Sequence, residues 1–358
     1  MNYARTLDRT VGRPIHSIVN NQNLSFYTPN NGSWECRPGS NIWYIDNGKS
    51  APGTASKPRP LSREERFEVT DIPGAMQKMG WHVAAALLNK WFHFAPKNEA
   101  QSVFQKAHGF NRDGSGAYPH DRIDSSSVKL DWILSFSRAE KPFKKLQDST
   151  YLSTTFAING LLSALYAYRD QSQIDALQIC GDDIHRLHNN FQFQLMRVDT
   201  TALEKSEVFF KALLHHGRPD GLAGALGGFS FYAAVAEARF KKLLMGGTEA
   251  TVTKIALYMK NPYSFFDEGN EGGSQYLGHW NKEGIALVPF GYVAQRENFG
   301  GWSNYAIQPE GPYGRTFWPV HNSDFRLWQD QHNSGGDMVL YSDYRVVSIT
   351  PIRFRLPT

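Results

Sequence analysis

Hydrophobic residues recur at steps of three and four between residues 70 and 95. This spacing predicts one amphipathic helix of about five turns, which Pro96 ends. A second helix is expected over residues 152–168, although Gly160 weakens that prediction. The periodic residues of the first helix are Met76, Met79, Val83, Leu87 and Trp91.

The pattern changes character after about residue 190. Apolar and polar residues alternate with period two in FQFQLMRV, and TVTKIALYMK and MVLYSDYRVVSI are also strand-like. An earlier stretch, residues 129–137, is also read as a strand. Helices followed by strands predict an α+β fold, with N-terminal helices packed on a mainly antiparallel C-terminal β-sheet or barrel.

The first 60 residues are polar and end in the Pro-, Gly- and Ser-rich run GKSAPGTASKPRP. We interpret residues 1–60 as a flexible polar arm and linker. Residues 61–358 are then expected to form a single domain, with a helical subregion over 61–190 and a β-rich subregion over 191–358.

Composition and charge exclude several classes of protein. With 41% hydrophobic residues, the chain of 358 residues can build a sizeable core. A net charge of +4, with no run of like charges, gives no support for a nucleic-acid partner. Two cysteines, Cys36 and Cys180, are too few for a disulfide framework or a four-cysteine zinc site.

The densest group of chemically capable side chains lies near the C-terminus, in HNSDFRLWQDQHNSGGDMVLYSDYRVV. A helix that starts near Ser323, followed by a turn at Gly335 and Gly336, could bring histidines, carboxylates and an arginine to one end of a sheet for acid–base chemistry. The alternative is a capped helix and a tight turn with structural hydrogen bonds. The candidate catalytic residues are His321, Asp324, Arg326, Asp337 and Asp343.

A second stretch, YMKNPYSFFDEGNEGGSQYLGHWNKEG, combines aromatic and acidic residues that could line a substrate pocket. The alternative is a loop that packs its aromatic rings onto a sheet. Its candidate substrate-binding residues are Tyr263, Asp267, His279 and Trp280, and Tyr276 is a further pocket candidate.

No metal site is predicted, and the sequence leaves any cofactor unknown. His185 and His188 are three residues apart and could share a metal on a helix. Their segment, ICGDDIHRLHNN, is polar all round and is interpreted instead as solvated. The phosphate-binding glycine motifs and the G-x-S-x-G elbow of serine hydrolases are absent.

Residues 221–236 carry no charge, but at 16 residues they are short for a membrane span and include four glycines. We interpret them as a buried strand with a glycine bend. A membrane-inserting segment of a pore-forming toxin is the alternative, and it would be the route of any contact with a membrane.

Three stretches together resemble one bacterial family, catalogued as domain of unknown function 6402. They are FEVTDIPGAMQKMGWHVAAALLNKWF, the YMKNPYSF…QYLGHWNKEGI segment and DFRLWQDQHNSGGDMVLYSDYRVV. The genes of this family resemble cargo genes of the type VI secretion system that lie near spike and tip proteins. The resemblance implies an interbacterial toxin or an accessory to one, and it carries no catalytic assignment.

A fainter similarity concerns residues 260–265. In relatives this segment looks like K-D-T-Y-D-F, which is similar to the active-site segment of colicin M-type lipid II hydrolases. Here it reads KNPYSF, so Asn261 and Ser264 replace both acids. An acid–base or metal role at these two positions is therefore in doubt, and Asp267 could substitute only if the loop shifts.

These observations favour an antibacterial effector delivered by a type VI secretion system. If it is an enzyme, hydrolysis of a cell-envelope component is the expected reaction. The first 25 residues contain no apolar run of a signal peptide, so the protein is expected to be cytoplasmic in the producer and to reach target cells without one. Expected partners are spike or tip proteins and a cognate immunity protein. The alternatives are a non-enzymatic adaptor of the apparatus and a pore-forming toxin.

Overall fold

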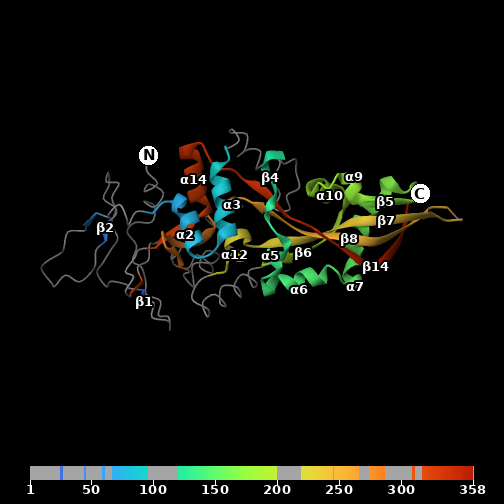
Figure 1. The fold of residues 1–358 in the computed structure, drawn as a ribbon, viewed down its shortest axis with the longest axis horizontal. Helices are drawn as coiled ribbons and strands as arrows, with labels where there is room; N and C mark the ends of the chain where they lie inside the picture. The colour runs from blue at the N-terminus through green and yellow to red at the C-terminus, as the bar shows by residue number, and fades with distance from the viewer. Residues whose placement is uncertain are drawn as a thin grey trace. The chain divides into compact units, whose positions relative to one another are not determined.

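The computed structural model describes residues 67–95, 120–199, 219–244, 246–265, 274–286 and 317–357, together with four two-residue strands (Figure 1). Contacts divide the chain into two compact units. Unit 1 comprises residues 1–96, 209–221 and 265–336, and unit 2 comprises residues 97–208, 222–264 and 337–358. Each unit draws on residues from both sides of position 190. The single domain over residues 61–358 remains a prediction.

Most of the predicted arm, residues 1–60, lies outside the described residues. The short strands found there and in residues 309–310 form two antiparallel pairs, β1 with β11 and β2 with β3. Their bounds are Ser25–Phe26 (β1), Tyr44–Ile45 (β2), Arg59–Pro60 (β3) and Pro309–Glu310 (β11).

The helix predicted over residues 70–95 is two helices, so the expectation of one continuous helix was wrong. A 3-10 turn, η2 (Val69–Asp71), leads into α2 (Ile72–Lys78), and α3 (His82–His93) follows. Gly80 separates them with a φ of 77°, a left-handed conformation typical of the residue after a helix C-cap. The N–H of Trp81 then donates to the carbonyl of Met76 at 2.8 Å and closes the end of α2.

Unit 1 also contains a three-stranded antiparallel sheet in the order β10-β9-β12, and a helix that follows β12. These elements are β9 (Tyr276–Asn281), β10 (Gly284–Ala286), β12 (Trp318–His321) and α14 (Asn322–His332). Trp91 of α3 is fully buried at the centre of an aromatic cluster. Its ring lies 5.0–6.2 Å, between centroids, from those of Phe92, Phe265, Phe325 and Trp328. Aromatic contacts therefore join α3 to α14.

Unit 2 is built on a curled, mixed and mainly antiparallel sheet (Figure 1). β7 and β8 form a long antiparallel hairpin, and β13 and β14 pair one after the other with β8. β4 adds to β13 in parallel, while β5 and β6 pair with the other edge of β7. The strands are β4 (Ile123–Val128), β5 (Gln173–Asp175), β6 (Gln192–Val198), β7 (Phe229–Lys242), β8 (Thr248–Tyr263), β13 (Met338–Ser342) and β14 (Arg345–Leu356).

The uncharged segment 221–236 forms α12 (Gly221–Leu226) and the first half of β7. Residues 231–236 are all buried, and β7 pairs with strands on both of its edges. The segment therefore occupies an interior position in the sheet, as its interpretation as a buried strand predicted. Among the described residues, no helix is both long and apolar enough to cross a membrane.

The strand predicted over residues 129–137 was wrong, because residues 130–134 form α5 and α6 begins at Ser137. Leu130 and Ile133 are both buried, which is the spacing of a helix face. The N–H of Leu130, in the first turn of α5, donates to Asp343 Oδ1 at 2.6 Å and so finds an acceptor outside the helix. The helical elements of unit 2 are η3 (His120–Arg122), α5 (Leu130–Leu134), α6 (Ser137–Lys145), α7 (Ser149–Leu152), α8 (Thr155–Leu165), η4 (Tyr166–Tyr168), α9 (Ala176–Cys180) and α10 (Ile184–Phe191). The predicted α+β class is confirmed.

Gly160 gives a first testable prediction, because α8 approaches the backbone of β6 at this residue. A Cβ atom at Gly160 would lie 2.8 Å from the carbonyl oxygen and 2.9 Å from the Cα atom of Phe193. We expect Gly160→Ala to lower the free energy of unfolding by about 1–3 kcal/mol, although alanine is the better helix former. Urea unfolding measures the change. Ser163→Ala, at an exposed position of the same helix, is the control and should change stability by less than about 0.5 kcal/mol. A Gly160→Ala protein as stable as the wild type would contradict this packing.

Candidate functional site

Two of the predicted catalytic residues lie together at the start of α14. His321 is the N-cap residue of this helix, and its backbone N–H donates to Asp324 Oδ2 at 2.8 Å. The Nδ1 atom of His321 lies 3.8 Å from the same carboxylate oxygen. An acidic residue in the first turn is favoured by the exposed N–H groups and the dipole of the helix. The local sequence therefore places a carboxylate beside the imidazole of His321.

Tyr276 and His279 meet on β9, and both are buried. The Tyr276 hydroxyl is hydrogen-bonded to His279 Nδ1. Residues three apart normally face opposite sides of a strand, but β9 has one more residue than β12 between their paired positions. Such a bulge turns two side chains to the same face. Gly278 lies in this bulge with a φ of 109°, a backbone conformation that residues with a side chain rarely adopt.

The pairing of β9 with β12 brings these two groups together. His321 is directly opposite Tyr276, and their ring centroids are 5.6 Å apart. Of the four side chains, His321 has the largest measured exposure, at 13%, whereas His279 is fully buried. We call this set the β9–β12 cluster, and it consists of Tyr276, His279, His321 and Asp324.

The other two candidates in unit 1 have structural contacts. Trp280 is buried, its ring packs edge-on against Trp81 with the centroids 6.1 Å apart, and its indole N–H donates to the Leu277 carbonyl at 3.1 Å. Arg326 donates from Nε to the carbonyl of Phe265 at 3.0 Å. Trp280 therefore joins β9 to Trp81, and Arg326 joins α14 to Phe265, both within unit 1.

In unit 2, Asp337 lies next to the predicted binding residue Tyr263. Met338 pairs opposite Tyr263, and the Ser264 hydroxyl donates to Asp337 Oδ2 at 2.7 Å. Asp337 is only 2% exposed. Burial lowers the pKa of Arg122, and the charges of Asp121 and Asp337 offset part of that decrease. Burial also raises the pKa of the Tyr263 hydroxyl. A buried carboxylate thus lies within hydrogen-bond distance of the Ser264 hydroxyl.

The remaining candidates separate into three cases. Asn261, at the other position that lacks an acid, donates from Nδ2 to the Leu226 carbonyl at 3.0 Å. Asp343 accepts the N–H of Leu130, as described above, so it has a structural contact at the start of α5. Asp267 lies outside the described residues.

A buried network in unit 2 was missed by sequence reasoning. The Nζ atom of Lys260 lies 2.8 Å from His188 Nε2, and His188 Nδ1 lies 2.9 Å from the Tyr258 hydroxyl. A lysine ammonium only donates, so with Lys260 protonated Nε2 accepts and the imidazole proton is on Nδ1. Next to this network, His185 Nδ1 lies 2.9 Å from the hydroxyl of Tyr341.

The environment of His188 strongly favours its neutral form. Burial first, then the charges of Lys260 and His185, lower the pKa of His188 to about 2. Burial also raises the pKa of Tyr258 well above its ordinary value. The interpretation of this segment as solvated was therefore wrong for His188. The available signals were a lysine within the otherwise uncharged stretch of residues 258–265 and a histidine pair spaced for one helix face.

Two points concern metals and thiols. Among the described residues, no group of three or more histidine, cysteine, aspartate or glutamate side chains could hold a metal ion. Cys180 is free and buried, and burial raises the pKa of its thiol, which disfavours a reactive thiolate. Cys36 lies outside the described residues.

Comparison with known proteins identifies a family but no activity. Residues 67–356 match the model of a family described as "Family of unknown function (DUF6402)". No curated protein matches the chain. No solved structure matches it either.

Proposed function

We propose a function for this chain from the geometry of the β9–β12 cluster, since the chain belongs to a family, DUF6402, whose own function is unknown. We propose that the protein is an antibacterial effector that hydrolyses a cell-envelope component. The observation that carries this proposal is the position of His321, which lies beside Asp324 and directly opposite Tyr276.

In the proposed hydrolysis, His321 is the general acid–base residue. His321 accepts a proton from a water molecule as that water attacks the substrate bond, and it then gives the proton to the leaving group. The elements of water are thereby added across the broken bond. The Asp324 carboxylate, 3.8 Å from Nδ1, stabilises the protonated form of the imidazole through its negative charge. With the Nδ1–H of His279 donating to the Tyr276 oxygen, the Tyr276 hydroxyl is suited to donate toward the negative charge that develops on the substrate.

Delivery by a type VI secretion system is part of the proposal, and it rests on the resemblance of the family's genes to cargo genes of that system. Spike or tip proteins and an immunity protein are the proposed partners. A non-enzymatic adaptor is the competing role, and it predicts binding to spike or tip proteins without any need for His321. A pore-forming role is disfavoured, because residues 229–236 would have to leave an interior strand that is paired on both edges.

The test compares three proteins expressed in a susceptible bacterium, each with and without a periplasmic leader. The wild type with the leader should reduce viable counts, and His321→Ala should restore them to the level of the empty vector. Loss of a general acid–base residue typically lowers a rate by about 10²–10⁴-fold. His332→Ala is the matched control, since His332 is an exposed histidine at the other end of α14 and should leave toxicity unchanged.

Two results would reject this proposal. Absence of toxicity in both compartments would argue against an effector, and equal toxicity of His321→Ala and His332→Ala would argue against the β9–β12 cluster. Asp337→Asn provides a further comparison. If this variant loses toxicity while His321→Ala keeps it, the reactive site lies at Asp337 and Ser264 instead. Circular dichroism of each purified variant shows whether it is folded.

A further inference from the structure

The free end of the β7–β8 hairpin presents four cations on one face of the sheet in unit 2. Strand pairing places them in two adjacent rows across β7, β8 and β14. In one row Thr251 lies between Arg239 and Arg353, and in the other Glu249 lies between Lys241 and Arg355. Directly opposed residues on neighbouring strands project from the same face. The four cations are Arg239, Lys241, Arg353 and Arg355.

The positive charge of these rows is not balanced by neighbouring carboxylates. All four cations are exposed, and among the described residues none of them forms an ion pair within 4.0 Å. Nearby lysines differ, since Lys242 pairs with Asp170 at 2.5 Å and Lys254 pairs with Glu237 at 2.7 Å. Glu249 is the one acidic residue within the two rows, which leaves a surplus of positive charge.

An apolar residue lies at the tip of the same hairpin. Leu244 is fully exposed, with a relative accessibility of 108%. The turn is closed by the N–H of Leu243, which donates to the Gly247 carbonyl at 3.1 Å. Figure 1 shows that the hairpin extends beyond the ends of β5 and β14. A single exposed leucine is ordinary on a protein surface, but here it projects beyond a cationic face.

We propose that this end of the hairpin binds the surface of an anionic lipid bilayer. Leu244 enters the headgroup region, and the four cations contact lipid phosphates. An apolar tip flanked by lysine and arginine has the composition of segments that lie in the interface of anionic membranes. We call Arg239, Lys241, Leu244, Arg353 and Arg355 the basic hairpin end. This inference does not depend on the β9–β12 cluster.

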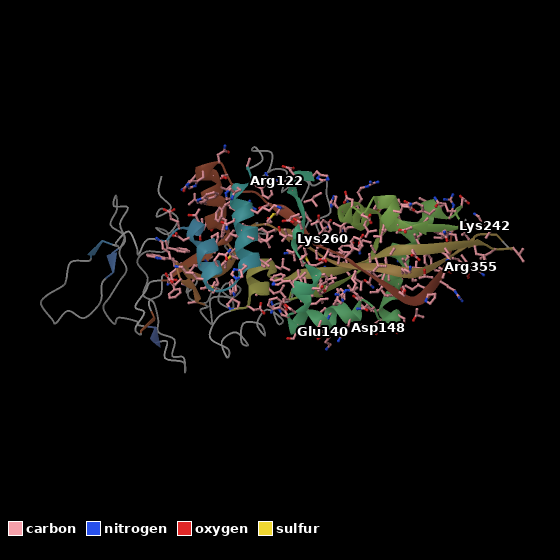
Figure 2. The ribbon with its side chains drawn as sticks, viewed as in Figure 1. Arg122, Glu140, Asp148, Lys242, Lys260 and Arg355 are labelled. Atoms are coloured by element: carbon pink, nitrogen blue, oxygen red, sulfur yellow. The ribbon has the colours of Figure 1, made fainter. Side chains whose placement is uncertain are left out.

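The charges on α6 and α7 provide a contrast within the same unit. Lys144 pairs with Glu140 at 2.5 Å, and Lys145 pairs with Asp148 at 3.2 Å. Figure 2 shows Glu140 and Asp148 along α6 and α7, whereas Lys242 and Arg355 lie at the ends of β7 and β14. Four cations that form no ion pair among the described residues thus gather at the hairpin end, which would direct that end of unit 2 toward a negative membrane.

The experiment measures sedimentation of the full chain with lipid vesicles. One set of vesicles is phosphatidylcholine alone, and the other contains phosphatidylglycerol as the anionic lipid. Each cation near an anionic surface raises the partition coefficient by about fivefold. We therefore expect Arg353→Gln with Arg355→Gln to lower partition onto the anionic vesicles by about 25-fold. Leu244→Ser should lower it by about tenfold.

The matched control is Lys141→Gln with Lys144→Gln, which removes the same charge from the exposed face of α6. It should change partition by less than about twofold, because the effect of a charge falls off within a Debye length of about 8–10 Å. Equal partition onto both kinds of vesicle would overturn the proposal. An effect of the arginine variant no larger than that of the control would also overturn it.

Two further results separate a membrane from other partners. Unchanged partition of the Leu244→Ser variant would reject insertion of the tip. Binding to polyglutamate without binding to anionic vesicles would assign the basic hairpin end to a soluble polyanion and overturn the membrane proposal. These measurements read out binding alone, so their failure is distinguishable from a failure of the proposed hydrolase activity.

Discussion

Acidification from about pH 6.5 to about pH 4.5 should lower the free energy of unfolding by about 2 kcal/mol through His188 alone. The pKa of His188 in the folded protein is lowered to about 2, against an ordinary value of 6.5. Between these two values the unfolded chain binds a proton that the folded chain excludes. The stability that the neutral imidazole provides is therefore present above pH 6.5 and is lost as the pH falls toward 2.

The measurement is urea unfolding at a series of pH values, for the wild type and for His188→Gln. The variant should be less stable than the wild type at pH 7, because it disturbs the contacts with Lys260 and Tyr258. Its free energy of unfolding should, however, fall less steeply as the pH is lowered. The slope of the variant should be smaller than that of the wild type by up to about 1.4 kcal/mol per pH unit. An identical slope for His188→Gln and the wild type would show that His188 is protonated in the folded state.

Gly335→Ala should lower the free energy of unfolding by roughly 3 kcal/mol, the second large effect that we expect. Two costs add at this residue. Gly335 has a φ of 98°, which side chains rarely adopt, and a Cβ atom there would lie 2.7 Å from the ring of Trp91. Trp91 is fully buried among aromatic rings and has little room to move. Strain of the backbone contributes about 1 kcal/mol, and overpacking contributes about 1–3 kcal/mol.

Gly80→Ala separates these two costs. Gly80 also has a positive φ, of 77°, but nothing lies within 4 Å of a Cβ atom placed there. It should therefore show the backbone cost of about 1 kcal/mol alone. Trp91→Phe removes the ring atoms that the new Cβ would meet, so the double variant Gly335→Ala/Trp91→Phe should be more stable than the sum of the single effects predicts. Equal losses for Gly335→Ala and Gly80→Ala would contradict the close contact with Trp91.

Local pattern predicted the elements whose apolar spacing is unambiguous. The alternation in residues 191–198 corresponds to β6, and the helix that was expected after Ser323 is α14. Prediction failed where a contact distant in the sequence decides the structure. Residues 130–134 have strand-like composition, yet they form α5, and the first of them donates its N–H to Asp343, 213 residues later. At Gly80 the signal was present, because a glycine inside a helical pattern is also a C-terminal signal.

The candidate site was predicted in part. Residue chemistry selected both His321 with Asp324 and His279 with Tyr276, but the bulge in β9 that joins these pairs depends on strand register. The network of Lys260 was missed for a similar reason, since Lys260 and His188 are 72 residues apart. His188 faces the sheet because α10 packs it against Tyr232 of β7, Tyr258 of β8 and Tyr341 of β13.

The pairing of β13 and β14 with β8 also constrains the order in which unit 2 can be assembled during synthesis. Residues 338–356 cover one edge of β8 along most of its length, yet they are synthesised well after β8 itself. Until then, the backbone groups along that edge of β8 lack the partners they have in the finished sheet. Unit 2 is therefore completed only once these residues have been synthesised, so truncation before residue 338 would leave an open, apolar edge of β8 prone to aggregation.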